Sequence, residues 1–148
     1  MEIKAADVAK LRKMTGAGMM DCKKALTEAE GDFDRAQEII REKGKLIASK
    51  RADREASEGV VVAKTVGSKA YMLCLACETD FVAKNESFVA TANEILDIAI
   101  KNDAADIDAL MAVKVGEHTV AEFVTDKSGQ TGEKVEIAYY ARIEASYI

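Results

Sequence analysis

The sequence predicts an α+β protein in which a three-helix bundle precedes an antiparallel three-stranded sheet packed with helices. From residue 3 to about residue 43 the apolar residues recur at helical spacing in three short blocks. After Gly59 the pattern changes to short β-branched and apolar runs around a turn. The order that follows, two strands, then helices, then a last strand, indicates an antiparallel layer and not a doubly wound parallel sheet.

The composition excludes several classes of protein. The 148 residues suffice for one ordinary domain, or for a small module and a medium one, and with 49% hydrophobic residues the chain is globular. A net charge of −5 would repel a phosphate backbone, so no nucleic-acid partner is expected. No run approaches the roughly 18 apolar residues of a membrane span, so no membrane partner is expected and the predicted location is cytoplasmic. Three cysteines, an odd number, fit a reducing compartment.

The first 44 residues are predicted to form a small helical domain. The block ADVAKLRKM places Ala5, Val8 and Leu11 on one face and stops at the glycine turn TGAG. The next block, MMDCKKALTEAE, ends at Gly31, and the third, DFDRAQEIIREK, starts at the N-cap residue Asp32 and is expected to end at Gly44. The inward stripes of these two blocks are Cys22, Ala25, Leu26 and Ala29, then Phe33, Ala36, Ile39 and Ile40. Helices of about ten residues are marginal alone, so the three must pack together.

Residues 45–58 are predicted to be a solvated linker that is partly helical. The segment is rich in Ala, Lys, Arg and Glu, which are good helix formers, and it has no aromatic residue. An alternative is contact with RNA through its basic cluster, but acidic residues interrupt that cluster and no aromatic ring is present to stack on bases. The basic residues are Lys45, Lys50, Arg51 and Arg54, and the acidic ones are Asp53, Glu55 and Glu58.

Residues 59–148 are predicted to form the α+β part. VVVAKTV and KAYMLCLACET read as a hairpin around Gly67-Ser68, and NESFVATANEILDIAI as a helix that covers the sheet. Short helices are expected at IDALMAV and TVAEFVTD, and a half-buried strand in EKVEIAYYARIEASYI. The apolar face of the covering helix is Phe88, Ala92, Ile95, Leu96 and Ala99, and that of the last strand is Val135, Ile137, Tyr139, Ala141 and Ile143.

Enzymatic chemistry finds little support in these residues. His118 is the only histidine, and a lone histidine ahead of a helix is more often solvated than catalytic. Cys74 and Cys77 have C-x-x-C spacing, but residues three apart on a strand point to opposite faces, which favours packing over a zinc or redox site. Gly16 and Gly18 follow no strand and form no phosphate loop. We therefore expect no catalytic residue, no metal site, no cofactor and no direct nucleotide binding.

Two sets of apolar residues are left over from the predicted core. Met19 and Met20 are adjacent, so both cannot lie on the stripe of their helix, and at least one faces outward. An exposed methionine there is either incidental or a deformable contact for a partner. Phe81, in CETDFVAKN, either tucks under the following helix or projects as a rigid wedge. The periodicity alone leaves both choices open.

Two longer motifs resemble a known family. LRKMTGAGMMDCKKAL, from Leu11 to Leu26, resembles the N-terminal signature of bacterial elongation factor Ts, and CETDFVAKN resembles its second signature. The motifs stand in the order and at the spacing that the family uses, and the resemblance extends over residues 1–148. It implies that the N-terminal domain is similar to ubiquitin-associated domains, with residues 45–58 as linker and 59–148 as the first core subdomain.

The resemblance also implies a function and a partner. Members of the family are guanine-nucleotide exchange factors, not enzymes, and bind elongation factor Tu in its GDP-bound and nucleotide-free forms. The family inserts an Asp-Phe pair between two helices of this GTPase, which perturbs the Mg²⁺ and phosphate site so that GDP leaves. The implied contacts here are Asp80 and Phe81 with the flanking Thr79 and Val82, then Arg12, Met19, Met20 and Lys23, and finally Thr131 and Gly132, where Thr131 replaces an apolar residue of the family.

Other readings stay open at this stage. The first domain could belong to a general peptide- or ubiquitin-binding module, but that class does not need the motif from Thr79 to Val82. An RNA-binding accessory protein of translation is a further alternative, which a steep salt dependence of RNA binding would reveal. Because the family usually continues into a second core subdomain, the chain is expected to be an N-terminal part that binds its partner more weakly than the longer form. The oligomeric state is left undetermined.

Overall fold

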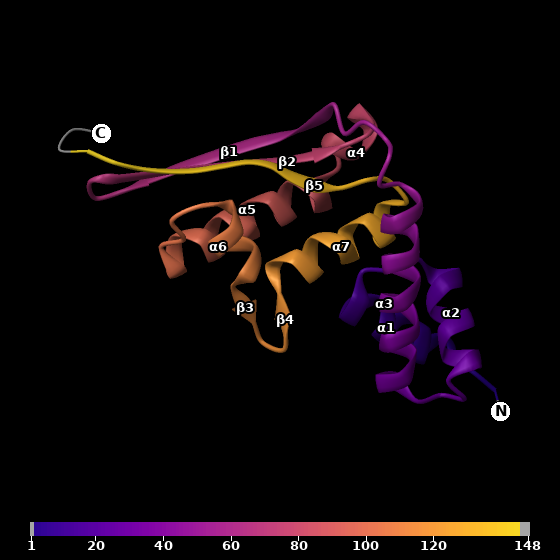
Figure 1. Ribbon diagram of the computed structural model, residues 1–148. Helices are drawn as coiled ribbons and strands as arrows, with labels where there is room; N and C mark the ends of the chain where they lie inside the picture. Colours follow the sequence, from indigo (N-terminus) through magenta and orange to yellow (C-terminus); the bar gives the residue numbers. More distant parts are fainter. Residues whose placement is uncertain (1, 146–148) are drawn as a thin grey trace.

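The N-terminal bundle consists of three helices, α1 (Ala5–Thr15), α2 (Met19–Glu28) and α3 (Phe33–Lys50). They are seen in a computed structural model that describes residues 2–145 (Figure 1). Gly16 ends α1 in the left-handed conformation, with φ +73°, and the Asp32 carboxylate caps α3 by accepting from two backbone N–H groups. The predicted stripe of α2 is buried, as are Val8 and Leu11, whereas Ala5 is exposed because the helix begins there.

The predicted end of the third helix at Gly44 is wrong, because α3 continues to Lys50. Glycine costs about 1 kcal/mol in a helix interior, but tertiary contacts override such preferences. Here Gly44 is buried against another glycine, Gly129, and the residues that follow it are good helix formers. The expectation that the linker is partly helical is confirmed, and the division of the chain at residues 44 and 58 stays a prediction.

The second part contains the predicted antiparallel sheet. Its strands are β1 (Glu58–Val66), β2 (Lys69–Cys77) and β5 (Glu136–Glu144), in the order β1-β2-β5. The hairpin between β1 and β2 turns at Gly67, which has φ +61°. The final residues 146–148, which the sequence placed in the last strand, lie outside the described residues. The predicted α+β class, a helical bundle followed by a three-stranded antiparallel sheet packed with helices, is confirmed.

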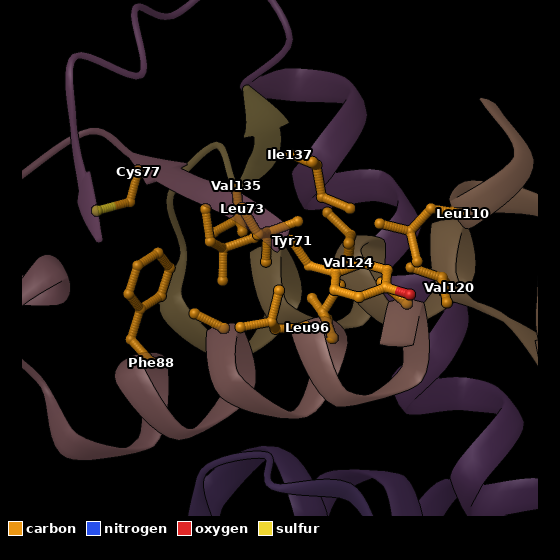
Figure 2. Packing of buried hydrophobic residues seen from close by; sticks show 14 of the residues in the cluster. Tyr71, Leu73, Cys77, Phe88, Leu96, Leu110, Val120, Val124, Val135 and Ile137 are labelled. Atoms are coloured by element: carbon orange, nitrogen blue, oxygen red, sulfur yellow. The ribbon is translucent and has the colours of Figure 1, made fainter. Parts of the chain in front are cut away.

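Three helices, α5 (Glu86–Asn102), α6 (Ile107–Ala112) and α7 (Val120–Thr131), lie along one face of the sheet (Figure 1). All five predicted inward residues of α5 are buried. Figure 2 shows Phe88 and Leu96 of this helix pointing toward Cys77 and Leu73 of β2. Two elements were not predicted: a one-turn helix, α4 (Asp80–Ala83), and a small hairpin of β3 (Lys114–Val115) and β4 (His118–Thr119) ahead of α7.

The predicted alternation of the last strand is wrong beyond Ile137. Cys74 of β2 pairs with Tyr139 and the next residue, Leu75, with Ile137, so Ala138 is an extra residue in β5. Such a bulge reverses the faces that the following side chains occupy. Tyr140 therefore turns inward and donates to the Ala104 carbonyl oxygen at 2.6 Å. Tyr139 and Ile143 lie instead on the face away from the helices, together with Val61 and Met72, and all four are exposed.

The bundle and the second part meet where α3 crosses α7. Gly44 and Gly129 face each other at the crossing, and a Cβ on Gly129 would lie 2.5 Å from the Gly44 Cα. Arg41 of α3 donates to Asp126 of α7 at 2.7 Å, and Gln130 donates its side-chain amide to the Thr15 carbonyl oxygen at 2.8 Å. Backbone contact, an ion pair and a hydrogen bond thus hold the two parts together.

A second polar cluster secures α5 to the far end of the sheet. Asp103, the left-handed C-cap of α5, accepts hydrogen bonds from Lys69 and Tyr71, each at 2.7 Å, and pairs with Arg142 at 3.1 Å. The hydrogen bonds from Lys69 and Tyr71, with that from Arg142, hold the pKa of the Asp103 carboxyl down, at about 2. The ionised carboxylate therefore stabilises the folded protein.

This cluster gives a testable pH dependence. A carboxyl whose folded pKa lies below its unfolded value, about 3.9, contributes stability that is complete above that value. The contribution is lost as the pH falls toward the folded value of about 2. We expect Asp103→Asn to lower the free energy of unfolding in urea near pH 7, and the difference from the unmodified chain to shrink as the pH falls below about 4. A difference that stayed constant over this range would contradict the role of the charge.

Candidate partner-binding site

The motif CETDFVAKN forms a sharp corner between β2 and α5. Thr79 is the N-cap of α4, where its hydroxyl accepts from the Val82 N–H, although at a long 3.4 Å. Within the single turn of α4, Val82 and Ala83 pack toward the core, whereas Asp80 and Phe81 point to solvent. The corner therefore presents the side chains of Asp80 and Phe81 next to each other in solvent, while the rest of the turn is packed on the core.

Phe81 is 85% exposed, more than any other large hydrophobic residue that the structure describes. The alternative that it tucks under α5 is therefore wrong, because Phe88 and Ala83 already fill the space between α5 and the sheet. Asp80 pairs loosely with Lys84, at 3.6 Å, and both side chains are largely exposed. Such a surface ion pair contributes little to stability, and it leaves the Asp80 carboxylate available to a partner.

Polar contacts from distant parts of the sequence brace the corner from behind. The Glu133 carboxylate accepts from the N–H groups of Glu78 and Thr79, at 3.1 and 3.0 Å, and from the Thr79 hydroxyl at 2.6 Å. The Glu78 carboxylate in turn accepts from the Lys134 N–H at 2.8 Å and from the Arg51 guanidinium at 2.7 and 3.1 Å. The Arg51 hydrogen bonds lower the pKa of Glu78, so this carboxyl stays ionised.

Thr131 and Gly132 immediately precede Glu133, so the structure brings them close to the Thr79 corner. Gly132 caps the C-terminus of α7 in the left-handed conformation, with φ +73°, and it is exposed. The Thr131 hydroxyl donates to the Lys127 carbonyl oxygen at 3.0 Å and accepts from the Glu133 N–H at 3.3 Å. Two candidate segments that lie far apart in the sequence thus share one end of the molecule.

The remaining candidate residues lie on the bundle, away from this corner. Both methionines that open α2 are exposed, Met19 by 59% and Met20 by 62%. Lys23 lines the same shallow depression on α2 as Met20, and Arg12 is exposed in the last turn of α1. Since α2 packs on α1 and α3, whereas α4 packs on the sheet, these residues form a second exposed surface.

Cys74 and Cys77 are packing residues of the sheet, and His118 lies at the surface. Cys77 is buried in the core while Cys74 lies half-buried on the other face, and both thiols are free. Burial raises the pKa of Cys77 to about 11, which keeps this thiol protonated and unreactive. His118 makes a partly exposed contact of 2.9 Å with Glu122. Among residues 2–145, no cluster of His, Cys, Asp and Glu could hold a metal ion, and no helix is long and apolar enough to span a membrane.

Known proteins match both the corner and the bundle of this chain. A family model described as "Elongation factor TS" matches residues 78–148, which include the corner. Over 147 residues, 99% of this chain and 45% of the relative, the chain is 56% identical to "Elongation factor Ts" from Parabacteroides distasonis. The protein of the same name from Bacteroides thetaiotaomicron is 54% identical over 99% of this chain and 44% of the relative.

A third relative gives a similar result. "Elongation factor Ts" from Rhodopirellula baltica is 50% identical over 99% of this chain and 46% of the relative. The chain thus spans about half the length of the curated relatives it matches. Over 99% of its length, which includes the corner and both methionines of α2, this chain is thus similar to proteins named elongation factor Ts.

Proposed function

We propose that this chain acts in translation as a guanine-nucleotide exchange factor that binds elongation factor Tu in the cytoplasm and promotes release of GDP. In this proposal Phe81 and Asp80 enter between two helices of the GTPase, supported by Thr79 and Val82. The insertion displaces the segment that holds Mg²⁺ and the phosphate loop. The chain itself binds no nucleotide and performs no covalent chemistry.

The observation that carries the proposal is the 85% exposure of Phe81 on a corner whose base is buried and braced. An exposed aromatic ring can be buried by a partner with a large gain in apolar contact, and a rigid support lets it act as a wedge. The second surface, with Met19 and Met20, supports a separate docking point on the same partner. Arg12, Lys23, Thr131 and Gly132 complete the proposed contacts.

The energetics require more than one contact. Because coupling between two sites is reciprocal, a factor that weakens GDP binding must itself be bound more weakly in the presence of GDP. Converting a mostly occupied nucleotide site into a mostly empty one takes a differential affinity of about 5.5 kcal/mol. Burial of one phenylalanine supplies roughly 1.5–3 kcal/mol. The loss of metal coordination and the docking of the bundle must therefore supply the remainder.

The direct experiment measures release of fluorescent GDP from purified elongation factor Tu, with and without this chain. Acceleration that saturates with the concentration of the chain is the expected result. Excess Mg²⁺ should reduce the effect, since the proposal depends on disturbing the metal. An unchanged release rate at high concentration of the folded chain would refute the exchange function for these 148 residues.

Met20→Ala tests the role of the second surface. Because Met20 is exposed on α2 and remote from the corner, its truncation should remove contact area without altering the wedge. We expect the dissociation constant for elongation factor Tu to rise roughly tenfold, the scale of one buried side chain, with GDP release at saturation nearly unchanged. Met14→Ala is the matched control, an exposed methionine of α1 outside the proposed contacts. A loss of the saturated rate in Met20→Ala would contradict this separation of roles.

A further inference from the structure

The corner that carries Phe81 has little intrinsic stability. Helix α4 consists of four residues, and a helix this short does not persist without contacts from the rest of the protein. Its side-chain cap is a weak one, since Thr79 accepts from the Val82 N–H at 3.4 Å. Something beyond α4 must therefore fix the direction in which Phe81 points.

Glu133 is the residue that reaches the corner from outside. It follows Gly132, where α7 ends in the left-handed conformation, and this turn aims the Glu133 side chain back at the end of β2. There the carboxylate accepts three hydrogen bonds, two from the backbone and one from the Thr79 hydroxyl. The 2.6 Å bond from the hydroxyl is in the range of a charge-assisted bond, the strong kind.

The contact between the two segments is reciprocal. The backbone of Glu78 donates to the Glu133 carboxylate, and the backbone of Lys134 donates to the Glu78 carboxylate. Arg51, the C-cap residue of α3, closes the set by donating twice to Glu78. Each carboxylate is thus held in place by the other segment, and the pair is tied to the end of the bundle's last helix.

We propose that Glu133 is a positioning residue that orients Phe81 through Thr79, and that the Arg51–Glu78 pair holds this arrangement against α3. Glu133 does not touch the partner in this proposal; it acts only by fixing the first turn of α4. The inference deepens the proposed exchange function and rests on it for its effect on GDP release. Its structural half concerns the free chain and can be tested without a partner.

Glu133→Ala removes the acceptor for two N–H groups and one hydroxyl, whereas Glu133→Gln keeps a carbonyl oxygen for the N–H groups and an amide that can donate to the Thr79 hydroxyl. Glutamine is therefore the conservative variant, expected to retain most of the positioning. Glu136→Ala is the matched control. Glu136 lies three residues further along the chain and makes a partly exposed ion pair with Lys134 at 3.6 Å.

The first experiment is amide hydrogen exchange of the free chain. The diagnostic amides are those of Ala83 and Lys84, which bond to the Thr79 and Asp80 carbonyl oxygens and never to Glu133 itself. We expect Glu133→Ala to lower their protection roughly tenfold, with Glu133→Gln and Glu136→Ala close to the unmodified chain and core amides of α5 unchanged in all variants. Unchanged protection of Ala83 and Lys84 in Glu133→Ala would overturn the inference, whatever the chain does to GDP release.

The second experiment uses the GDP-release assay at saturating concentration of each variant. Glu133→Ala should reduce the stimulated rate roughly tenfold and raise the dissociation constant much less, and Glu133→Gln should restore most of the rate. In a Phe81→Ala background the Glu133→Ala change should have almost no further effect, because the side chain that it positions is gone. Equal losses in both backgrounds, or a loss confined to the dissociation constant, would overturn the inference. Absence of stimulation by the unmodified chain would instead count against the proposed function, and hydrogen exchange would still decide the positioning.

Discussion

Phe81→Ala is expected to abolish most of the acceleration of GDP release while weakening binding to elongation factor Tu only modestly. A phenylalanine that becomes buried in the complex contributes roughly 1.5–3 kcal/mol, equivalent to about 10- to 150-fold in rate if the contact is made chiefly while the nucleotide leaves. Docking through the bundle would remain, because Met19 and Met20 lie on a different surface. The measurement is stimulated GDP release over a range of factor concentrations, which separates the saturated rate from the dissociation constant.

The matched control for this change is Tyr139→Ala. Tyr139 is also an aromatic residue with high exposure, 66%, but it lies on the open face of the sheet. Neither substitution removes a core contact, so neither should alter the free energy of unfolding by more than about 0.5 kcal/mol. Losses of saturated rate and of affinity in equal measure for Phe81→Ala would refute the wedge and would indicate an ordinary docking residue.

Gly129→Ala and Gly44→Ala are expected to have opposite effects on stability, although the two glycines touch each other. A Cβ on Gly129 would lie 2.5 Å from the Gly44 Cα, so the helices must separate. Overpacking of this kind costs about 1–3 kcal/mol. A Cβ on Gly44 would meet the Gly129 Cα at 3.6 Å and the Thr125 carbonyl oxygen at 3.9 Å, which are ordinary contacts. Alanine is the better helix former by up to about 1 kcal/mol, so Gly44→Ala should be neutral or stabilising.

Thermal unfolding would measure both effects. For a chain of this size the destabilisation by Gly129→Ala corresponds to a melting temperature lower by roughly 3–10 °C. Each glycine serves as the control for the other, since the same residue type is changed at the same crossing. Destabilisation by both substitutions would contradict the room for a Cβ at Gly44, and no effect of Gly129→Ala would contradict the tight contact at Gly129.

Local patterns in the sequence sufficed for most of the fold. Helical spacing placed the bundle and α5, and β-branched runs around Gly67 placed the hairpin, because these elements depend on residues close in sequence. The strand bulge at Ala138 was not predictable, since a strand with uninterrupted alternation has no local sign of an extra residue. The end of α3 was misplaced for a similar reason: a glycine that normally ends a helix is held in it by Gly129, 85 positions along the chain.

Part of the candidate site could be predicted from the sequence, and part could not. Helical periodicity predicted the exposure of at least one methionine. For Phe81 periodicity left both choices open, and only the motif resemblance pointed to an exposed side chain. The hydrogen bonds that brace the corner could not be predicted from local patterns. Glu133 bonds to Thr79 across 54 positions of the sequence, and Arg51 bonds to Glu78 across 27. In the sequence Arg51 is one basic residue among several in a polar segment, and only the fold shows that it is paired.

The continuity of α3 has a mechanical consequence. From its crossing with α7 at Gly44, the helix extends about 16 Å back to Phe33 and about 10 Å forward to Arg51, at about 1.5 Å per residue. If α3 tilted about these two glycines as a rigid body, it would act as a lever with unequal arms. A tilt of about 10° would carry Arg51 through nearly 2 Å, enough to break its 2.7 Å hydrogen bond to Glu78. A displacement of the Phe33 end of α3 would then move Arg51, behind the Phe81 corner, in the opposite direction. The displacement of Arg51 would be smaller by about a third, in proportion to the two arms.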